Sequence, residues 1–204
     1  MSARADVSGE DSLAAARALF ADALRDEDAH RFSDALGKFE RVRDVRDTAP
    51  IEYRIASCYE GLGRPASAYG AYRDAIVLGR RDAQSADVVG AAAARLEILA
   101  PRLSRLTLVM APTDAVNPDV RIDGAPTPRD KLGEPVTLDP GHHAITATAP
   151  GFAPFHSDVA LPAGAQASLT ITLFPIASPP LPSRVADERP AGSHRVAGWA
   201  AVVG

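Results

Sequence analysis

The fold is indicated first by residues 56–75, which read ASCYEGLGRPASAYGAYRDA. A helical run stops at Gly61-Leu62-Gly63, and Pro65 opens the next one, a pattern that predicts two helices joined by a tight turn. Four small or aromatic residues mark the packing positions, at offsets of 0, 12, 16 and 19: Ala56, Ala68, Tyr72 and Ala75. The same offsets occur 33 positions earlier, at Ala23, Ala35, Phe39 and Val42. The chain therefore contains a repeated helical hairpin, with small residues where its helices cross.

This repeat resembles the tetratricopeptide (TPR) repeat, which has a period of about 34 residues and small residues at the helix crossings. The resemblance implies an array of helix pairs, each packed on the next. Such arrays present surfaces to other protein chains. The resemblance therefore implies a binding module, with no catalytic residues to carry over.

Five helices are expected in a TPR-like α-helical repeat domain over residues 12–104. Residues 1–11 are small, polar and acidic, and we expect them to be disordered. The fifth helix, over Ala83–Leu99, places Gly90 34 residues after Ala56, where a third repeat would have its small residue. No partner helix follows, because Pro101 interrupts the pattern. We therefore interpret the fifth helix as the cap of a short array.

From Leu106 the apolar period changes from 3.6 residues to 2, which is typical of strands. Turn signals such as Asp123-Gly124 and Pro140-Gly141 recur every 10 to 15 residues. They predict an antiparallel β-sandwich of six or so strands over residues 105–174, and an α+β multidomain fold. One apolar set should share the core: Leu108, Ile122, Leu138, Ile145, Ile171 and Leu173. Three threonines should point outward: Thr146, Thr148 and Thr170.

The strand region resembles the PEGA domain, a small extracytoplasmic β-sandwich of bacterial envelope proteins. The matching segments are residues 120–124, 136–143, 145–147, 151–152 and 169–173. The Pro-Glu-Gly-Ala tetrapeptide itself is missing, and Asp139-Pro140-Gly141 occupies that turn. TPR-like repeats followed by a PEGA-like domain resemble envelope proteins common in myxobacteria. This order implies a location in the cell envelope and a role in assembly.

The end of the sequence suggests membrane attachment. Residues 175–195 form a Pro-rich linker, and residues 196–204 are uncharged and include Trp199. Nine residues cannot cross a bilayer, which needs about 20. We interpret this apolar tail as the start of a truncated transmembrane helix, and the alternative is a short apolar tail.

The sequence evidence on location points in two directions. No signal peptide is visible at the start, but Ala3-Arg4-Ala5 has the form of a signal-peptidase site whose leader lies upstream. Three arginines before the apolar tail favour the opposite, cytoplasmic, orientation: Arg184, Arg189 and Arg195. We expect an envelope or periplasmic protein, with a cytoplasmic adaptor as the alternative.

The partner-binding candidates are the side chains of the first helix of each hairpin that face the groove of the array. Counted from Ala23 and Ala56, they are Phe20, Leu24, Glu27, Tyr53, Ser57 and Glu60. For Phe20 and Leu24, the alternative is that they pack on the neighbouring helix. Tyr53 lies outside the packing stripe, so we expect it to act as the anchor for a protein or peptide partner. The acidic run Asp26-Glu27-Asp28 is interpreted as a solvated face at the end of the first helix, with the rim of the groove as the alternative.

Other chemistry has little support. The net charge is −4 and the basic residues are not clustered, which argues against nucleic-acid binding. Cys58 is the only cysteine, and we expect it to be a buried apolar side chain. His142-His143 could suggest a metal-dependent hydrolase, but adjacent strand residues point to opposite faces. No nucleotide-binding or nucleophile motif is present. We therefore expect no metal, no cofactor and no enzymatic activity.

Overall fold

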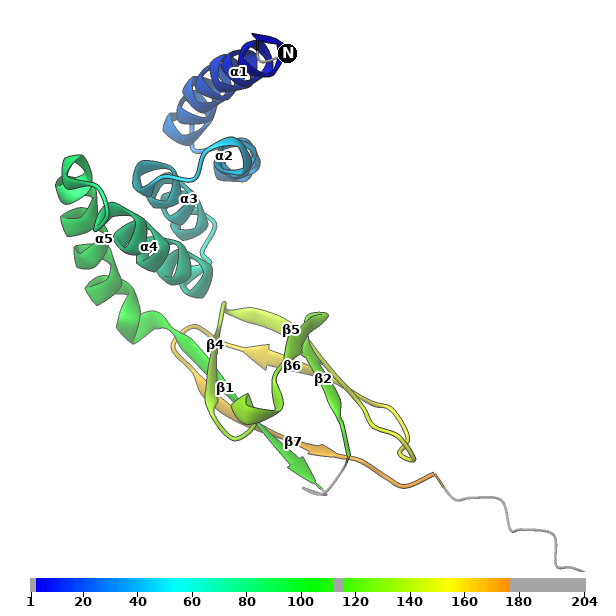
Figure 1. Ribbon diagram of the computed structural model, residues 1–204. Helices are drawn as coiled ribbons and strands as arrows, with labels where there is room; N and C mark the ends of the chain where they lie inside the picture. Colours follow the sequence, from blue (N-terminus) through cyan, green and yellow to red (C-terminus); the bar gives the residue numbers. More distant parts are fainter. Residues whose placement is uncertain (1–2, 112–115, 177–204) are drawn as a thin grey trace, which may run out of the picture.

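The computed structural model describes residues 3–111 and 116–176 (Figure 1). In this part of the chain, five α-helices are followed by two small sheets, so the architecture is α+β. The helices occupy one end of the molecule and the strands the other (Figure 1). Of the predicted linker, the structure describes only Pro175 and Ile176, where Pro175 forms a β-bridge with Phe152; the rest of the linker and the apolar tail lie outside the described residues. No helix in the described ranges is long and apolar enough to span a membrane.

The helices pack on one another in chain order. Their bounds are α1 (Ala3–Asp28), α2 (Phe32–Val45), α3 (Ala49–Gly61), α4 (Pro65–Gly79) and α5 (Ala86–Leu99). Pro50 and Pro65 stand in the first turns of α3 and α4, where the missing N–H costs nothing. Gly63 (φ +71°) closes the turn between these helices.

Two helix starts differ from the prediction. Helix α1 begins at Ala3, not near Ser12; residues 3–11 contain no proline, and Ala3, Arg4 and Ala5 are good helix formers. The fifth helix begins at Ala86, because residues 83–85 form a 3₁₀ turn. Asp82 holds this tighter turn by accepting hydrogen bonds from the Gln84 N–H (3.0 Å) and the Ser85 hydroxyl (2.8 Å).

The predicted crossing residues lie in the core of the helical domain. Ala23, Ala35, Ala56 and Ala68 are all completely buried. Phe39, Tyr72 and Ile55 fill the space between the helices. Gly90 differs from this pattern, because it is exposed and a Cβ added there would meet no neighbouring atom within 4 Å. The close approach of α5 to α4 occurs instead at Gly79, where an added Cβ would lie 2.5 Å from the Val89 side chain.

The strands form two sheets. One has the order β4-β1-β7 and the other β3-β2-β5-β6. The strand bounds are β1 (Ser104–Ala111), β2 (Asp119–Ile122), β3 (Ala125–Thr127), β4 (Pro135–Leu138), β5 (Gly141–Thr148), β6 (Phe155–Leu161) and β7 (Gln166–Thr172). The expectation of purely antiparallel pairing is wrong for one pair, because β7 runs parallel to β1. The period-2 pattern could not reveal this, since it is the same in parallel and antiparallel strands.

Both sheets contribute to one shared core. Its buried side chains include Leu106 and Leu108 of β1, Ile122 of β2, Ile145 of β5 and Ile171 of β7. The predicted register is confirmed. Five of the six predicted core residues are buried, and the sixth, Leu138, packs half-buried against the same cluster. Of the threonines, Thr148 and Thr170 are exposed and Thr146 is half-buried.

The β domain caps a helix of the helical domain. Asp139, in the turn between β4 and β5, accepts hydrogen bonds from the backbone N–H groups of Ala66 (2.6 Å) and Ser67 (3.1 Å) and from the Ser67 hydroxyl. These amides belong to the first turn of α4 and have no partner within the helix. Arg64, at the N-cap position, makes no side-chain cap bond. A carboxylate from 72 residues away therefore satisfies this helix end and complements its dipole.

Removing this cap should destabilise the protein. We expect Asp139→Ala to lower the free energy of unfolding by about 0.5–2 kcal/mol, the usual cost of losing an N-cap acceptor. Asp139→Asn, which keeps one acceptor oxygen, should lose less. Chemical denaturation of the full chain measures both, with Asp158→Ala as the control, because Asp158 is an exposed carboxylate of the same domain. Equal stability of wild type and Asp139→Ala would show that the cap contributes nothing.

Candidate partner-binding surface

The candidate residues of α1 lie partly in the core. Phe20 is half-buried and packs edge-on against Phe39 of α2, with ring centroids 5.4 Å apart. Leu24 is also half-buried against the helical core. Glu27 is buried, and its carboxylate lies 3.3 Å from Arg54 of α3, so this ion pair bridges two hairpins. These three side chains all have contacts within the fold.

The acidic run at the end of α1 is not a solvated face. Asp26 and Glu27 are buried, and only Asp28 is exposed. Lys38 of α2 approaches Asp26 at 2.5 Å and also contacts Asp22, while Arg31 reaches Asp26 from the turn. Hydrogen bonds from Lys38 and then Arg31 lower the pKa of Asp26. The prediction of a solvated face was wrong because Arg31 and Lys38, the cations that pair with Asp26, follow α1 in the sequence. They reach its carboxylate only when α2 folds back against α1.

The candidates on α3 also have roles in packing. Tyr53 is half-buried and lies edge-on to Tyr72 of α4, with ring centroids 5.2 Å apart, so the expectation that it lies outside the packing was wrong. Glu60 accepts hydrogen bonds from the Tyr72 hydroxyl (2.9 Å) and from Arg95 Nε (2.8 Å) of α5. It thus ties three helices together. Ser57, half-buried, lies between Tyr53 and Glu60 on α3.

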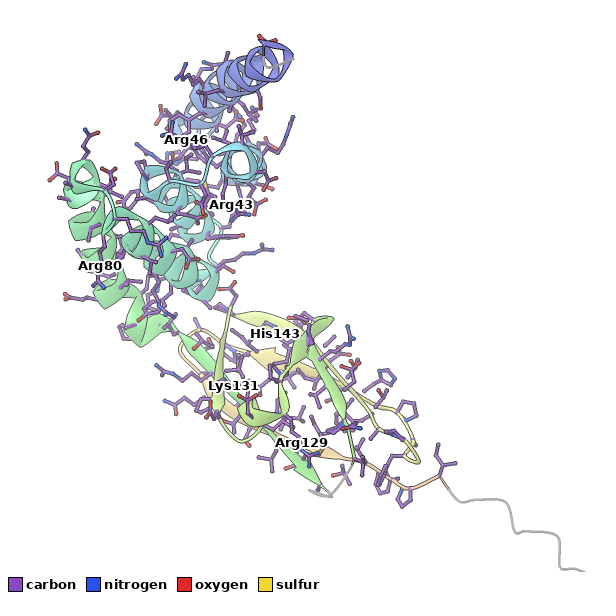
Figure 2. The ribbon with its side chains drawn as sticks, in the orientation of Figure 1. Arg43, Arg46, Arg80, Arg129, Lys131 and His143 are labelled. Atoms are coloured by element: carbon purple, nitrogen blue, oxygen red, sulfur yellow. The ribbon has the colours of Figure 1, made fainter. Side chains whose placement is uncertain are left out.

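An apolar hollow of about 320 Å³ opens between α1, α2 and the start of α3. Its walls are apolar side chains and its edge carries two arginines; the lining is Leu13, Ala16, Arg17, Phe20, Val42, Arg46, Thr48, Pro50 and Ile51. Arg17 and Arg46 are exposed, and neither has an ion-pair partner in the described part of the chain. Arg46 lies in the connection between α2 and α3 (Figure 2). We call this feature the α1–α3 hollow.

A second hollow of about 280 Å³ lies between α3 and α5, and its lining includes Tyr53. Both hollows are lined by Pro50, so they flank the N-terminal end of α3. Of the six sequence candidates, Phe20 lines the first hollow and Tyr53 the second, and the other four line neither. Sequence reasoning missed Arg17 and Arg46. Arg46 could not be found by counting from the small residues of the first helices, because it lies outside every helix.

Of the residues considered for catalysis, Cys58 and His143 are buried and His142 is exposed. Cys58 is completely buried, and burial, together with the nearby Glu27, raises the pKa of its thiol to about 12. This thiol therefore carries no reactive thiolate near neutral pH. His142 is exposed and His143 buried, as expected for neighbours on a strand. Within residues 3–111 and 116–176, no group of three or more His, Cys, Asp or Glu residues could hold a metal ion.

The described residues define an array of helical hairpins joined to a two-sheet β domain. Comparison with known proteins adds no family to this description: no protein-family model matches the chain, and no curated protein sequence matches it significantly.

Proposed function

We propose that this chain is a non-catalytic interaction and scaffold protein of the bacterial cell envelope. In this proposal the TPR-like helices hold a short segment of a partner protein, and the PEGA-like β domain acts as a spacer or second contact. The envelope location rests on the resemblance of the two domains to envelope proteins. The α1–α3 hollow is the observation that carries the binding role.

The chemistry of the hollow selects the partner segment. Leu13, Phe20 and Ile51 offer an apolar wall that removes a side chain from water, worth about 1.5–3 kcal/mol for a buried Leu or Phe. Arg17 and Arg46, at the edge, favour carboxylates next to that side chain. The proposed ligand is therefore a peptide segment with a large apolar anchor beside one or two acidic residues.

Selection from a random peptide library displayed on phage tests this proposal. The immobilised full chain should enrich peptides in which Leu, Ile or Phe adjoins Asp or Glu. For an enriched peptide, Arg17→Ala combined with Arg46→Ala should weaken binding by about two- to thirtyfold, because each exposed charge pair contributes about 0.2–1 kcal/mol. Raising the salt concentration should weaken wild-type binding and have less effect on the double variant.

Controls separate the hollow from general charge. Arg80→Ala with Arg81→Ala removes two exposed arginines beyond the end of α4 and should leave binding unchanged. Leu13→Ser should weaken binding by removing part of the apolar wall. Enrichment of basic peptides, or equal loss with both arginine pairs, would contradict the proposed site.

A further inference from the structure

A buried histidine lies next to the contact between the two domains. The turn that carries Asp139 to the N-terminus of α4 is held from below by His143 of β5, whose Nε2 lies 2.7 Å from the backbone carbonyl oxygen of Asp139. The other ring nitrogen, Nδ1, lies 2.7 Å from Oδ2 of Asp123, in the turn between β2 and β3. His143 is buried at the end of the β domain that faces the helices (Figure 2).

Both partners of the ring are acceptors. A backbone carbonyl has no hydrogen to donate, and the second oxygen of Asp123 already accepts the Ala144 N–H at 2.8 Å, as an ionised carboxylate does. A neutral imidazole carries one N–H and can satisfy only one of these two oxygens. The imidazolium carries two and satisfies both. The geometry around His143 is therefore that of the protonated ring.

We propose that protonated His143 acts as a proton-dependent latch that holds the β domain against the N-terminus of α4. The latch consists of His143, Asp123 and Asp139 together with the first turn of α4 at Ala66 and Ser67. This inference is independent of the proposed partner binding, because its residues line neither of the two hollows between the helices.

The surroundings of His143 favour the charged form. Burial opposes protonation, but the hydrogen bonds to Asp123 and to the Asp139 carbonyl outweigh it and raise the pKa of His143. The charged groups that act on the ring are the carboxylates of Asp123 and Asp139. Helix α4 brings the uncharged Ala66 and Ser67 to this site, β4 brings Thr137 and Leu138, and β6 places Val159 opposite His143.

Loss of the second imidazole proton of His143 breaks one contact of the latch, the one between Nε2 and the Asp139 carbonyl oxygen. The neutral ring keeps its hydrogen for the Asp123 carboxylate, which is the stronger acceptor. The deprotonated Nε2 of His143 and the carbonyl oxygen of Asp139 then both present lone pairs to each other, so this contact becomes repulsive. The turn loses the bond that presents the Asp139 carboxylate to α4. The two domains should therefore be fixed below the pKa of His143 and free to reorient above it.

Two measurements on the full chain test the latch. NMR titration of the imidazole C–H signals should give His143 a pKa above 6.5, the ordinary value for a histidine, with the signal assigned by its loss in His143→Leu. Spin labels at Ser33→Cys in α2 and Ser168→Cys in β7, both exposed, report the distance between the domains by pulsed electron spin resonance. Cys58 is completely buried and should stay unlabelled. A variant that carries only Ser33→Cys checks this, because it should then contain one spin label per chain.

The expected result is a narrow distance distribution below the measured pKa of His143 and a broader one above it. In His143→Leu the distribution should be broad at both pH values. His142→Leu, which changes the exposed neighbouring histidine, should keep the wild-type response. The latch is overturned by a His143 pKa below 6.5, or by a wild-type distribution that stays unchanged while NMR shows that the proton has left.

Discussion

Replacing Ala68 by Leu should lower the free energy of unfolding by about 1–3 kcal/mol. Ala68 of α4 is completely buried, and Ala56 of α3, in the same core cluster, is buried to the same extent. Three extra carbon atoms have no space there, so either the helices move apart or the leucine takes a strained rotamer. Urea denaturation followed by circular dichroism measures the change as a lower unfolding midpoint.

The matched control is Ala93→Leu. Ala93 lies in α5 and is exposed, so the same substitution meets no neighbour and changes helix propensity very little. Its free energy of unfolding should stay within about 0.5 kcal/mol of wild type, as is usual at surface positions. If Ala68→Leu were as stable as Ala93→Leu, the close crossing of α3 and α4 would be refuted.

Glu52→Gln should stabilise the protein at pH 8 by about 1–3 kcal/mol. Glu52, in the first turn of α3, is only 4% exposed. Burial raises the pKa of its carboxyl to about 7; the charge of Arg43 opposes this shift, and Asp47 and Asp74 add to it. Arg43 lies 3.6 Å away, too far for a strong ion pair. One pKa unit corresponds to about 1.4 kcal/mol, which sets the scale of the gain.

The direction of the pKa shift determines how the stability difference between wild type and Glu52→Gln changes with pH. The pKa of Glu52 is raised in the folded state. Below the unfolded value of 4.5 the carboxyl is protonated in both the folded and the unfolded state, so wild type and Glu52→Gln should be equally stable. As the pH rises to about 7, the unfolded state releases the proton first, and wild type loses stability relative to Glu52→Gln. The difference between the two proteins is measured by denaturation from pH 4 to 8, so the contribution of His143, present in both, cancels. A less stable variant at pH 8 would show that the pair with Arg43 outweighs the burial.

Much of the fold could be predicted because it depends on local patterns. The 33-residue spacing of small residues located the hairpins, and all four crossing alanines are buried. The period-2 alternation gave the correct faces of the strands, since a slip of one residue would have exposed the core. The parallel pairing of β7 with β1 was not predicted, because it depends on where the chain returns after β6.

The candidate site could be predicted less well. Helical counting placed Phe20 and Tyr53 beside hollows, but it could not show that Tyr53 packs on Tyr72 or that Glu60 pairs with Arg95. The helical period of one helix predicts the direction in which a side chain points, but it does not identify the residue of another helix that the side chain contacts. The arginines at the edge of the α1–α3 hollow depend on three helices at once.

The sequence by itself determined where the helices and strands lie and which faces they bury, because apolar periodicity and turn residues act over a few positions. Only the tertiary structure decided which charged groups are buried and which partners they have. Glu52, which in the sequence is an acid at a helix start, is buried in the folded chain. Asp139, which in the sequence is a turn residue, caps a helix 72 residues away. Charge interactions depend on distance and burial, and only the folded chain sets both.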